Sequence, residues 1–373
     1  MNRDVNLRFP HVSTLSIPRS TREFAYIVVA QKLVLTLLVL LTPVFFPMLF
    51  TSNTSMSDKI ATGDTKHYIN IASHGYREQD PDCAFYPLWP ACIRCGSWLM
   101  RGSDTVVAWV AGNVFSLIGL ILFHLLVTDS HGINVANRAG ILILLYPGSV
   151  YFFVPYSESL CLLLFMFCLY SLRRNFLVGA ALASFLLPMS RAVGIFILPI
   201  LAWELFFKGG GYRRLWICLL PLLGYFCYFL IMYSYTGNPF EGFRMQLAYD
   251  AQPSISRIFD VSGFFYSFVH FNFVIDSLHS FLDRLIFVAF LLSLYPMLRL
   301  DTTYYVYAVF IGLIPAMSNI FMSYTRFSAL VFPVFIVWAR LTLRNRMLPV
   351  VAMLFYGLQV FFLVLLASGR WVN

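Results

Sequence analysis

Long apolar stretches alternate with short basic segments along most of the chain. We predict about eleven membrane crossings from this pattern, because each crossing needs about 20 apolar residues. The predicted spans lie near residues 26–50, 105–128, 139–156, 157–172, 175–190, 192–207, 215–235, 281–299, 303–323, 327–342 and 346–368. The pattern therefore predicts an all-α polytopic membrane protein that forms a single domain over residues 1–373.

Two long polar segments, 51–104 and 236–280, interrupt this pattern. If the N-terminus is cytoplasmic, both segments are extracytoplasmic and nearly every short cytoplasmic turn is basic, as the positive-inside rule requires. The residues that then face the cytoplasm are Arg3, Arg8, Arg19, Arg22, Arg138, Arg173, Arg174, Lys208, Arg213, Arg214, Arg299, Arg340, Arg344 and Arg346. We interpret Lys32 and Glu204 as anchors near the cytoplasmic surface. The outer compartment is a bacterial periplasm or the lumen of the endoplasmic reticulum, and the sequence leaves that choice open.

Composition agrees with a membrane protein. Hydrophobic residues make up 60% of the chain and charged residues 12%, where soluble domains have about 25% charged residues. A net charge of +9 would suggest nucleic acid in a soluble protein, but here we attribute it to membrane orientation and expect no nucleic-acid partner. We expect no cleavable signal peptide, because Arg3 and Arg8 precede polar sequence. Cys83, Cys92 and Cys95 could form a disulfide in an oxidising compartment.

Five charged residues that are distant in sequence fall on the same extracytoplasmic face in this topology: Asp64, Glu158, Arg191, Arg244 and Arg326. Charges within or beside membrane spans are costly, so they usually face a cavity and serve a function. Each one alone could instead be a snorkelling or helix-capping group. Together, a carboxylate can act as general base on a hydroxyl, and arginines can hold a phosphate leaving group. In a membrane that phosphate would belong to a lipid, which favours glycosyl transfer from a polyprenyl-phosphate sugar.

The stretch from residue 63 to residue 90 has the features of a reactive loop. Gly63 allows the chain to turn just before Asp64. Residues 67–76 predict a short amphipathic helix that lies on the membrane surface and stops near Gly75. Aromatic residues and prolines follow, as is typical of a membrane interface.

The polar residues of this stretch allow simpler interpretations as well. His67 and His74 are more often hydrogen-bonded interfacial residues than metal ligands, and the predicted site contains no metal. Glu78, Asp80 and Asp82 are most simply a solvated turn, although Glu78 could touch substrate.

The order of residues in this stretch resembles the PIG-V-like mannosyltransferases. The matching residues are Asp64, Tyr68, Ile71, Ala72, Gly75, Tyr76, Glu78, Ala84, Phe85, Tyr86, Pro87 and Pro90. Segments 155–159 and 188–195 also resemble the family, and residues 236–249 and 324–327 resemble it more loosely. The family usually has Trp where this chain has Gly63.

The resemblance implies a GT-C fold with amphipathic helices in the first extracytoplasmic loop. It implies an inverting transfer of a hexose, mannose in this family, from a polyprenyl (dolichyl) phosphate to a hydroxyl of a glycolipid or glycan acceptor. Asp64 would be the catalytic base, and Arg191, Arg326 and Arg244 would bind the donor phosphate. The substrate-binding residues would be His67, Tyr68, Glu78, Tyr86, Tyr156, Glu158 and Gln246. No cofactor or divalent metal would be required, and the enzyme could include a small membrane partner subunit.

A multi-pass transporter or lipid flippase is the alternative function. Such a protein is expected to place its charged residues near the bilayer midplane. The candidate residues here lie near one interface instead, which favours the enzyme. The sequence does not identify the acceptor.

Overall fold

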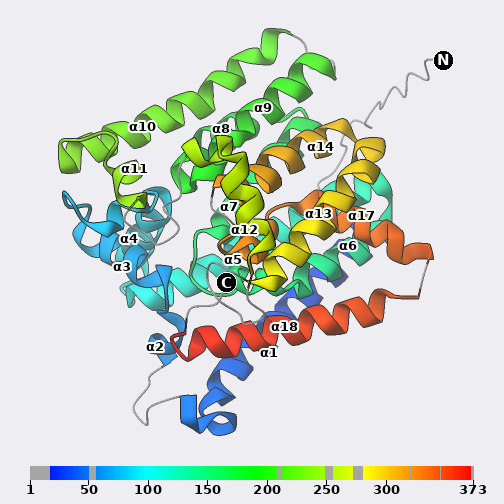
Figure 1. The fold of residues 1–373 in the computed structure, drawn as a ribbon, viewed down its shortest axis with the longest axis horizontal. Helices are drawn as coiled ribbons and strands as arrows, with labels where there is room; N and C mark the ends of the chain where they lie inside the picture. Colours follow the sequence, from blue (N-terminus) through cyan, green and yellow to red (C-terminus); the bar gives the residue numbers. More distant parts are fainter. Residues whose placement is uncertain are drawn as a thin grey trace.

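The computed structural model describes residues 17–49, 56–208, 212–247, 255–271, 280–318, 321–344 and 346–370. The predicted cytoplasmic Arg3 and Arg8, and parts of both predicted extracytoplasmic loops, lie outside these ranges. Within them the regular elements are helices and no strand occurs, which confirms the predicted all-α fold (Figure 1).

Helices lie within each of the predicted spans, but the number of eleven crossings stays a prediction. Among the described residues, five helical runs are long and apolar enough to cross a membrane. They are α1 (Arg19–Phe45), α5 (Asp104–His131), the run Arg214–Thr236 that contains α10 (Leu219–Thr236), α13 (Phe281–Leu300) and α18 (Leu348–Ala367). The other spans are shorter or broken: α6 (Ile133–Leu145), α7 (Glu158–Arg173), α8 (Leu177–Ser190), η4–α9–η5 (Ala192–Phe196, Ile197–Ala202, Trp203–Phe207), α14–η8–α15 (Thr302–Ala308, Val309–Leu313, Ile314–Ser318) and α17 (Phe332–Arg344).

Short helices fill the loops between these spans. The first loop holds α2 (Met56–Ile60), α3 (Asp64–His74), η2 (Pro81–Ala84) and α4 (Leu88–Met100). The second holds α11 (Glu241–Gln246), η7 (Ile255–Phe259) and α12 (Val261–Val269). Two further segments connect spans, η3 (Pro147–Phe152) and α16 (Tyr324–Ser328).

The break between α6 and α7 is stabilised by polar side chains from other helices. Prolines begin and end this break, so its backbone carbonyls lack helical partners. Phe152 O accepts hydrogen bonds from Lys32 Nζ (3.1 Å) and Ser116 Oγ (2.9 Å), and Phe153 O accepts from Asn113 Nδ2 (2.9 Å). The interpretation of Lys32 as an anchor near the cytoplasmic surface is therefore wrong. Its ammonium group binds inside the helix bundle, because non-helical backbone at membrane depth needs donors from the protein.

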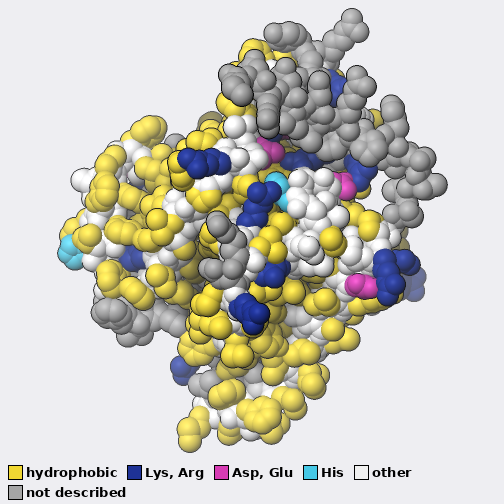
Figure 2. All heavy atoms as spheres, turned by 90° about the vertical axis from the view of Figure 1, so that its right-hand side faces the viewer, with side chains coloured by type: hydrophobic (Ala, Val, Ile, Leu, Met, Phe, Trp, Pro, Cys, Tyr) yellow, Lys and Arg dark blue, Asp and Glu magenta, His cyan; other side chains and the backbone are white. Residues whose placement is uncertain are grey.

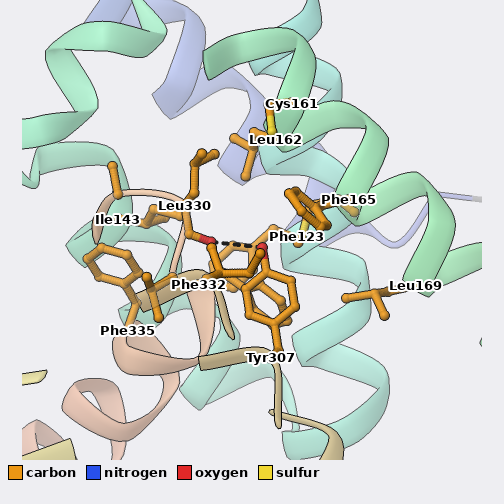
Figure 3. Packing of buried hydrophobic residues seen from close by; sticks show 14 of the residues in the cluster. Phe123, Ile143, Cys161, Leu162, Phe165, Leu169, Tyr307, Leu330, Phe332 and Phe335 are labelled. Carbon is orange, nitrogen blue, oxygen red and sulfur yellow. Dashed lines mark hydrogen bonds between the residues drawn. The ribbon is translucent and has the colours of Figure 1, made fainter. Parts of the chain in front are cut away.

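Aromatic side chains pack the middle of the bundle. Figure 3 shows Tyr307 among Phe165 and Phe332, with ring centroids 5.3 and 4.7 Å away. The Tyr307 hydroxyl donates to Leu330 O (2.9 Å), which is the usual way to bury a tyrosine in an apolar core. This packing joins α7, α14 and the start of α17, so it fixes where the preceding α16 lies.

The two ends of the bundle differ. The first-loop helices α3 and α4 lie at the left of Figure 1, and α14 and α17 lie at the right. Lys and Arg side chains gather on the right-hand face, where few Asp or Glu are visible (Figure 2).

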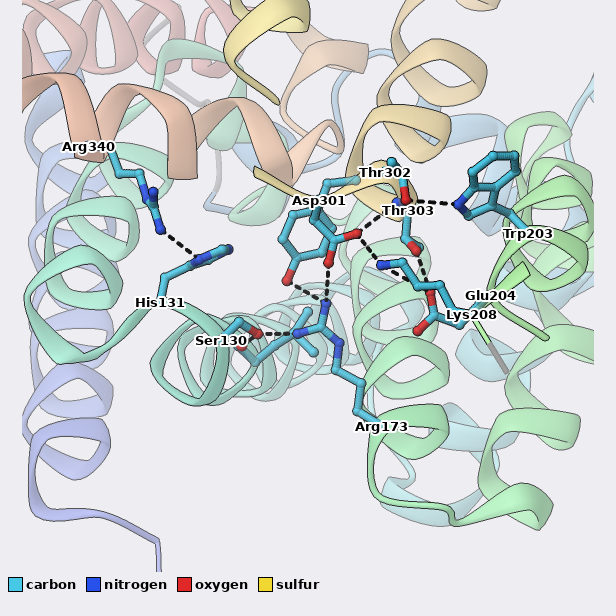
Figure 4. Close-up of polar contacts among 12 residues, drawn as sticks. Ser130, His131, Arg173, Trp203, Glu204, Lys208, Asp301, Thr302, Thr303 and Arg340 are labelled. Atoms are coloured by element: carbon cyan, nitrogen blue, oxygen red, sulfur yellow. Dashed lines mark hydrogen bonds and ion pairs between the residues drawn. The ribbon is translucent and has the colours of Figure 1, made fainter. Parts of the chain in front are cut away.

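A polar network joins helix ends on the side of α14 (Figure 4). Asp301 pairs with Lys208 and with Arg173 (3.6 Å), and Glu204 accepts a hydrogen bond from Thr303. We call the four ionic residues Arg173, Glu204, Lys208 and Asp301 the opposite-end network.

Candidate active site

The backbone at Gly63 places Asp64 at the start of α3. Gly63 has φ 52° and ψ −128°, a conformation that a residue with a side chain adopts only under strain. This explains why glycine, and not the family's usual Trp, fits here. The Asp64 N–H donates to Tyr156 Oη (3.1 Å), and the helix ends at Gly75 with φ 75°. The predicted amphipathic helix is therefore confirmed, with its start three residues earlier.

Four of the five predicted charged residues meet directly. Arg326 donates from its terminal nitrogen to Asp64 Oδ2 (2.6 Å) and from Nε to Glu158 Oε1. Arg191 donates to the same Glu158 oxygen (2.8 Å). Asp64 and Arg326 are 262 positions apart in sequence, so only the fold brings them together. We call Asp64, Glu158, Arg191 and Arg326 the charge cluster.

The charge cluster is deeply buried and formally neutral. Glu158 is 0% exposed, Arg326 5% and Asp64 8%. The Arg326 guanidinium also lies over the rings of Tyr156 (4.6 Å) and Tyr151 (4.9 Å). Burying charges is costly unless they are paired and hydrogen-bonded, yet Glu158 Oε2 is buried without a partner. Such an incompletely satisfied charge is unusual in a structural ion pair and typical of a functional site.

The two arginines of the charge cluster differ in their partners and in the exposure of their side chains. Arg326 binds both carboxylates, and its side chain is 6% exposed. Arg191 binds Glu158 and Ser157 Oγ (2.9 Å), and its side chain is 13% exposed. Arg191 is therefore the more accessible cation of the cluster.

Tyrosines line the same region. Tyr68, on α3, shares a hydrogen bond with Ser157 (2.7 Å), and Tyr156 Oη donates to Thr62 O (3.2 Å). Tyr86 lies in an adjacent aromatic group and stacks on Tyr228 of α10 (4.7 Å). Tyr68 and Tyr156 thus belong to the surroundings of the charge cluster, and Tyr86 to the neighbouring packing.

His67 is tied to Asp82 beside the cluster. His67 Nδ1 lies 2.6 Å from Asp82 Oδ1, Asn70 donates to Asp82 Oδ2 (2.5 Å), and the His67 ring stacks on Phe85 (4.6 Å). The hydrogen bond to Asp82 raises the pKa of His67, against the opposing effect of burial. Burial acts to raise the pKa of Asp82, but the hydrogen bonds from His67 and Asn70 outweigh it and lower that pKa. The prediction of a solvated turn is wrong for Asp82, which is 6% exposed because it fastens α3 to η2.

Of the second-loop residues that the structure describes, the two predicted to bind substrate, Arg244 and Gln246, make no hydrogen bond or ion pair with the charge cluster. Arg244 pairs with Glu241 (2.7 Å), whose same oxygen accepts from the Gln79 N–H (2.9 Å). Gln246 ends α11 and is partly buried, and Glu78 is exposed on the first loop. α11 therefore fastens the second loop to the first, at a distance from Asp64 in the packing.

Sequence reasoning missed Asp283 and Ser157. Asp283, in the first turn of α13, accepts hydrogen bonds from Thr325, the residue before Arg326. An acid at the start of an apolar span was the available signal. Cys83, Cys92 and Cys95 are free thiols, and Cys83 donates to Arg77 O (3.1 Å). Within the described ranges, no three His, Cys, Asp or Glu residues are grouped as metal ligands.

Comparisons with known proteins fit this architecture. The Archaeoglobus fulgidus oligosaccharyltransferase in complex with Zn and sulfate superposes with a TM-score of 0.51 at 14% identity, over 92% of this chain and 53% of that one. The same enzyme tethered to an acceptor peptide with the NVT sequon gives 0.48 at 13%, over 92% and 55%. This chain thus spans about half the length of those proteins, and the first likeness shows a shared GT-C fold. No curated protein matches in sequence.

A family model also matches the chain. The model of the mannosyltransferase (PIG-V) family covers residues 26–212, which include Asp64, Glu158 and Arg191. Among the described residues, five helices are long and apolar enough to cross a membrane, as expected of an integral membrane protein of this family. The chain belongs to the PIG-V mannosyltransferase family.

Proposed function

We propose that the protein transfers a hexose, mannose in keeping with its family, from a polyprenyl phosphate to a hydroxyl of a glycolipid or glycan acceptor. The transfer inverts the anomeric carbon. The observation that carries the proposal is the buried ion pair between Asp64 and Arg326, joined through Glu158 to the more accessible Arg191. It combines a base and a phosphate-binding cation at one end of a membrane bundle.

Asp64 acts as the general base. Arg326 engages Oδ2, so Oδ1 is left for the acceptor hydroxyl. As the hydroxyl oxygen bonds to the anomeric carbon, its proton passes to Asp64 and the bond from that carbon to the phosphate oxygen breaks. One carboxylate suffices for inversion, because the phosphate leaves as an anion without needing an acid.

Arg191 compensates the charge of the departing lipid phosphate. Its guanidinium is already oriented by Glu158 and Ser157, so little ordering remains when phosphate binds. Arg326 already bridges two carboxylates and its side chain is only 6% exposed, whereas that of Arg191 is 13% exposed. Arg244 is engaged by Glu241, so we assign the phosphate contact to Arg191. Because arginine supplies this charge, the proposed mechanism includes no divalent metal.

We also propose that the N-terminus is cytoplasmic and that the charge cluster faces the periplasm or lumen. The concentration of Lys and Arg on the opposite face supports this orientation (Figure 2).

The test is sugar transfer by purified protein in nanodiscs with defined polyprenyl-phosphate hexoses. Wild type should form product, and Asp64→Asn should reduce the rate by about 10³-fold or more because it removes the base. Asp104→Asn is the matched control, since Asp104 is a partly exposed acid that accepts from Ser73 in the same region. Normal turnover by Asp64→Asn would overturn the base assignment. Movement of lipid-linked sugar across vesicles without chemical transfer would instead support a flippase.

A further inference from the structure

A buried carboxylate on α13 contacts the segment that carries Arg326. Asp283 is 0% exposed, and its Oδ1 accepts from both the backbone N–H of Thr325 (2.5 Å) and the Thr325 hydroxyl. Its neighbour Arg284 donates to the carbonyls of Ser267 and Ser280. Burying a carboxylate at the start of an apolar helix is costly, so its retention calls for a specific contact.

The segment that Asp283 contacts cannot hold its own conformation. α16 has only five residues, and a helix of one turn is not stable by itself. It follows Phe321 and Ser323, which both have left-handed backbone angles, φ 63° and φ 57°. Left-handed non-glycine residues are strained and persist only where surrounding contacts fix them.

Contacts from other elements complete this fixation. A Cβ at Gly148 of η3 would clash with Thr325 O, so the η3 backbone lies directly against the Thr325 peptide. Ser328, at the end of α16, shares a hydrogen bond with Tyr146 (2.6 Å). Thr325 is thereby held between Asp283 on one side and η3 on the other, and the next side chain in the sequence is Arg326.

We propose that Asp283 is a positioning residue for the transfer reaction, which acts by fixing Thr325 and so aiming the Arg326 guanidinium at Asp64 and Glu158. Asp283 does not touch substrate in this role. Misplacement of Arg326 turns the Asp64 carboxylate away from the acceptor hydroxyl, and errors of about 1 Å in such geometry lower rates by about 100-fold. This role rests on the proposed glycosyl transfer.

The sharpest test compares two substitutions of Thr325. Thr325→Val keeps the shape but removes the hydroxyl that Asp283 accepts from, and we expect kcat to fall about 10- to 100-fold with donor KM within about twofold. Thr325→Ser keeps the hydroxyl and should retain activity. Asp283→Ala should lower kcat at least as far as Thr325→Val. Ser293→Ala is the control, because Ser293 lies on the same helix as Asp283. This substitution removes the hydrogen bond to Ala289 O and the one from Trp338 of α17.

A double-mutant cycle separates positioning from a purely structural role. If Thr325 acts through Arg326, Thr325→Val should reduce kcat no more than about twofold further in an Arg326→Lys background. A full additional loss there would overturn the proposal, as would a Thr325→Val enzyme as active as Ser293→Ala. Absence of turnover by wild type would instead overturn the proposed function, and this role with it.

Discussion

The charge cluster and the opposite-end network contain the same kinds of groups at opposite ends of one bundle. Each has two carboxylates and two cations, so each is formally neutral. In the opposite-end network, Lys208 is 32% exposed and Glu204 24%, whereas Glu158 is 0% exposed in the charge cluster. Members of the opposite-end network also bind residues at the start of α14: Glu204 accepts from Thr303, and Arg173 donates to Tyr304 Oη (2.8 Å) (Figure 4).

The difference lies in which hydrogen bonds are left unmade. Asp301 forms ion pairs with Lys208 and Arg173 and accepts a hydrogen bond from the Thr303 N–H, so it stabilises the start of α14. Glu158 receives both arginines on one oxygen and leaves the other buried and unpartnered. Charge composition alone therefore does not identify a site. The charge cluster is distinguished by its burial, by the unpartnered oxygen of Glu158 and by the direct contact of Arg326 with Asp64.

Removing one carboxylate from each cluster should separate the two roles most clearly. Glu158→Gln leaves Arg191 and Arg326 without their shared anion, and we expect kcat/KM to fall about 100-fold or more. Asp301→Asn keeps the cap on α14 and should leave kcat/KM within about twofold while lowering the unfolding temperature. Transfer assays and thermal unfolding in detergent measure both. A larger loss of activity in Asp301→Asn than in Glu158→Gln would reverse the assignment of the clusters.

Much of the fold and of the charge cluster could be predicted from the sequence, because it depends on hydropathy, glycine positions and the placement of basic residues along the chain. Hydropathy located the helical spans, and Gly75 marked the end of the helix that carries Asp64, although its start was predicted three residues too late. The alternation of basic turns placed Glu158 and Arg326 on one face before any contact was known.

The partners of several residues could not be predicted, because they depend on which helices pack side by side, and the membrane topology does not determine that. Arg244 was predicted to share a face with Asp64, but Glu241 holds it against the first loop. Lys32 has no sequence signal for its partners, which are carbonyls and side chains on α5 and η3. Asp283 and Thr325 are 42 positions apart, and no sequence pattern predicts that they are in contact.

Changing one cation in each cluster should have a smaller effect and should act on substrate affinity. Arg191→Lys replaces a planar fork by a point charge that cannot bind Glu158 and a phosphate in the same geometry, so we expect donor KM to rise about tenfold. Lys208→Met should leave donor KM within about twofold, because partly exposed ion pairs contribute little. Initial rates at varied donor concentration measure both. An unchanged donor KM in Arg191→Lys would remove its phosphate role.

The smallest effect should be a pH dependence of stability that belongs to the first loop and not to the opposite-end network. The groups that act on His67 are Asp82, Asp64 and Asp80, and the bond to Asp82 raises its pKa in the folded state. A pKa raised by folding gives stabilisation that is complete below the unfolded value of about 6.5 and is lost as pH rises through the folded value. The unfolding temperature of wild type should therefore fall as pH increases from about 6 to 9, and Asp82→Asn should abolish most of that fall. Asp104→Asn, which alters a partly exposed acid outside the pair, should keep the wild-type slope. If Asp82→Asn and wild type decline in parallel, the pH dependence arises elsewhere and His67 does not carry the added proton in the folded protein.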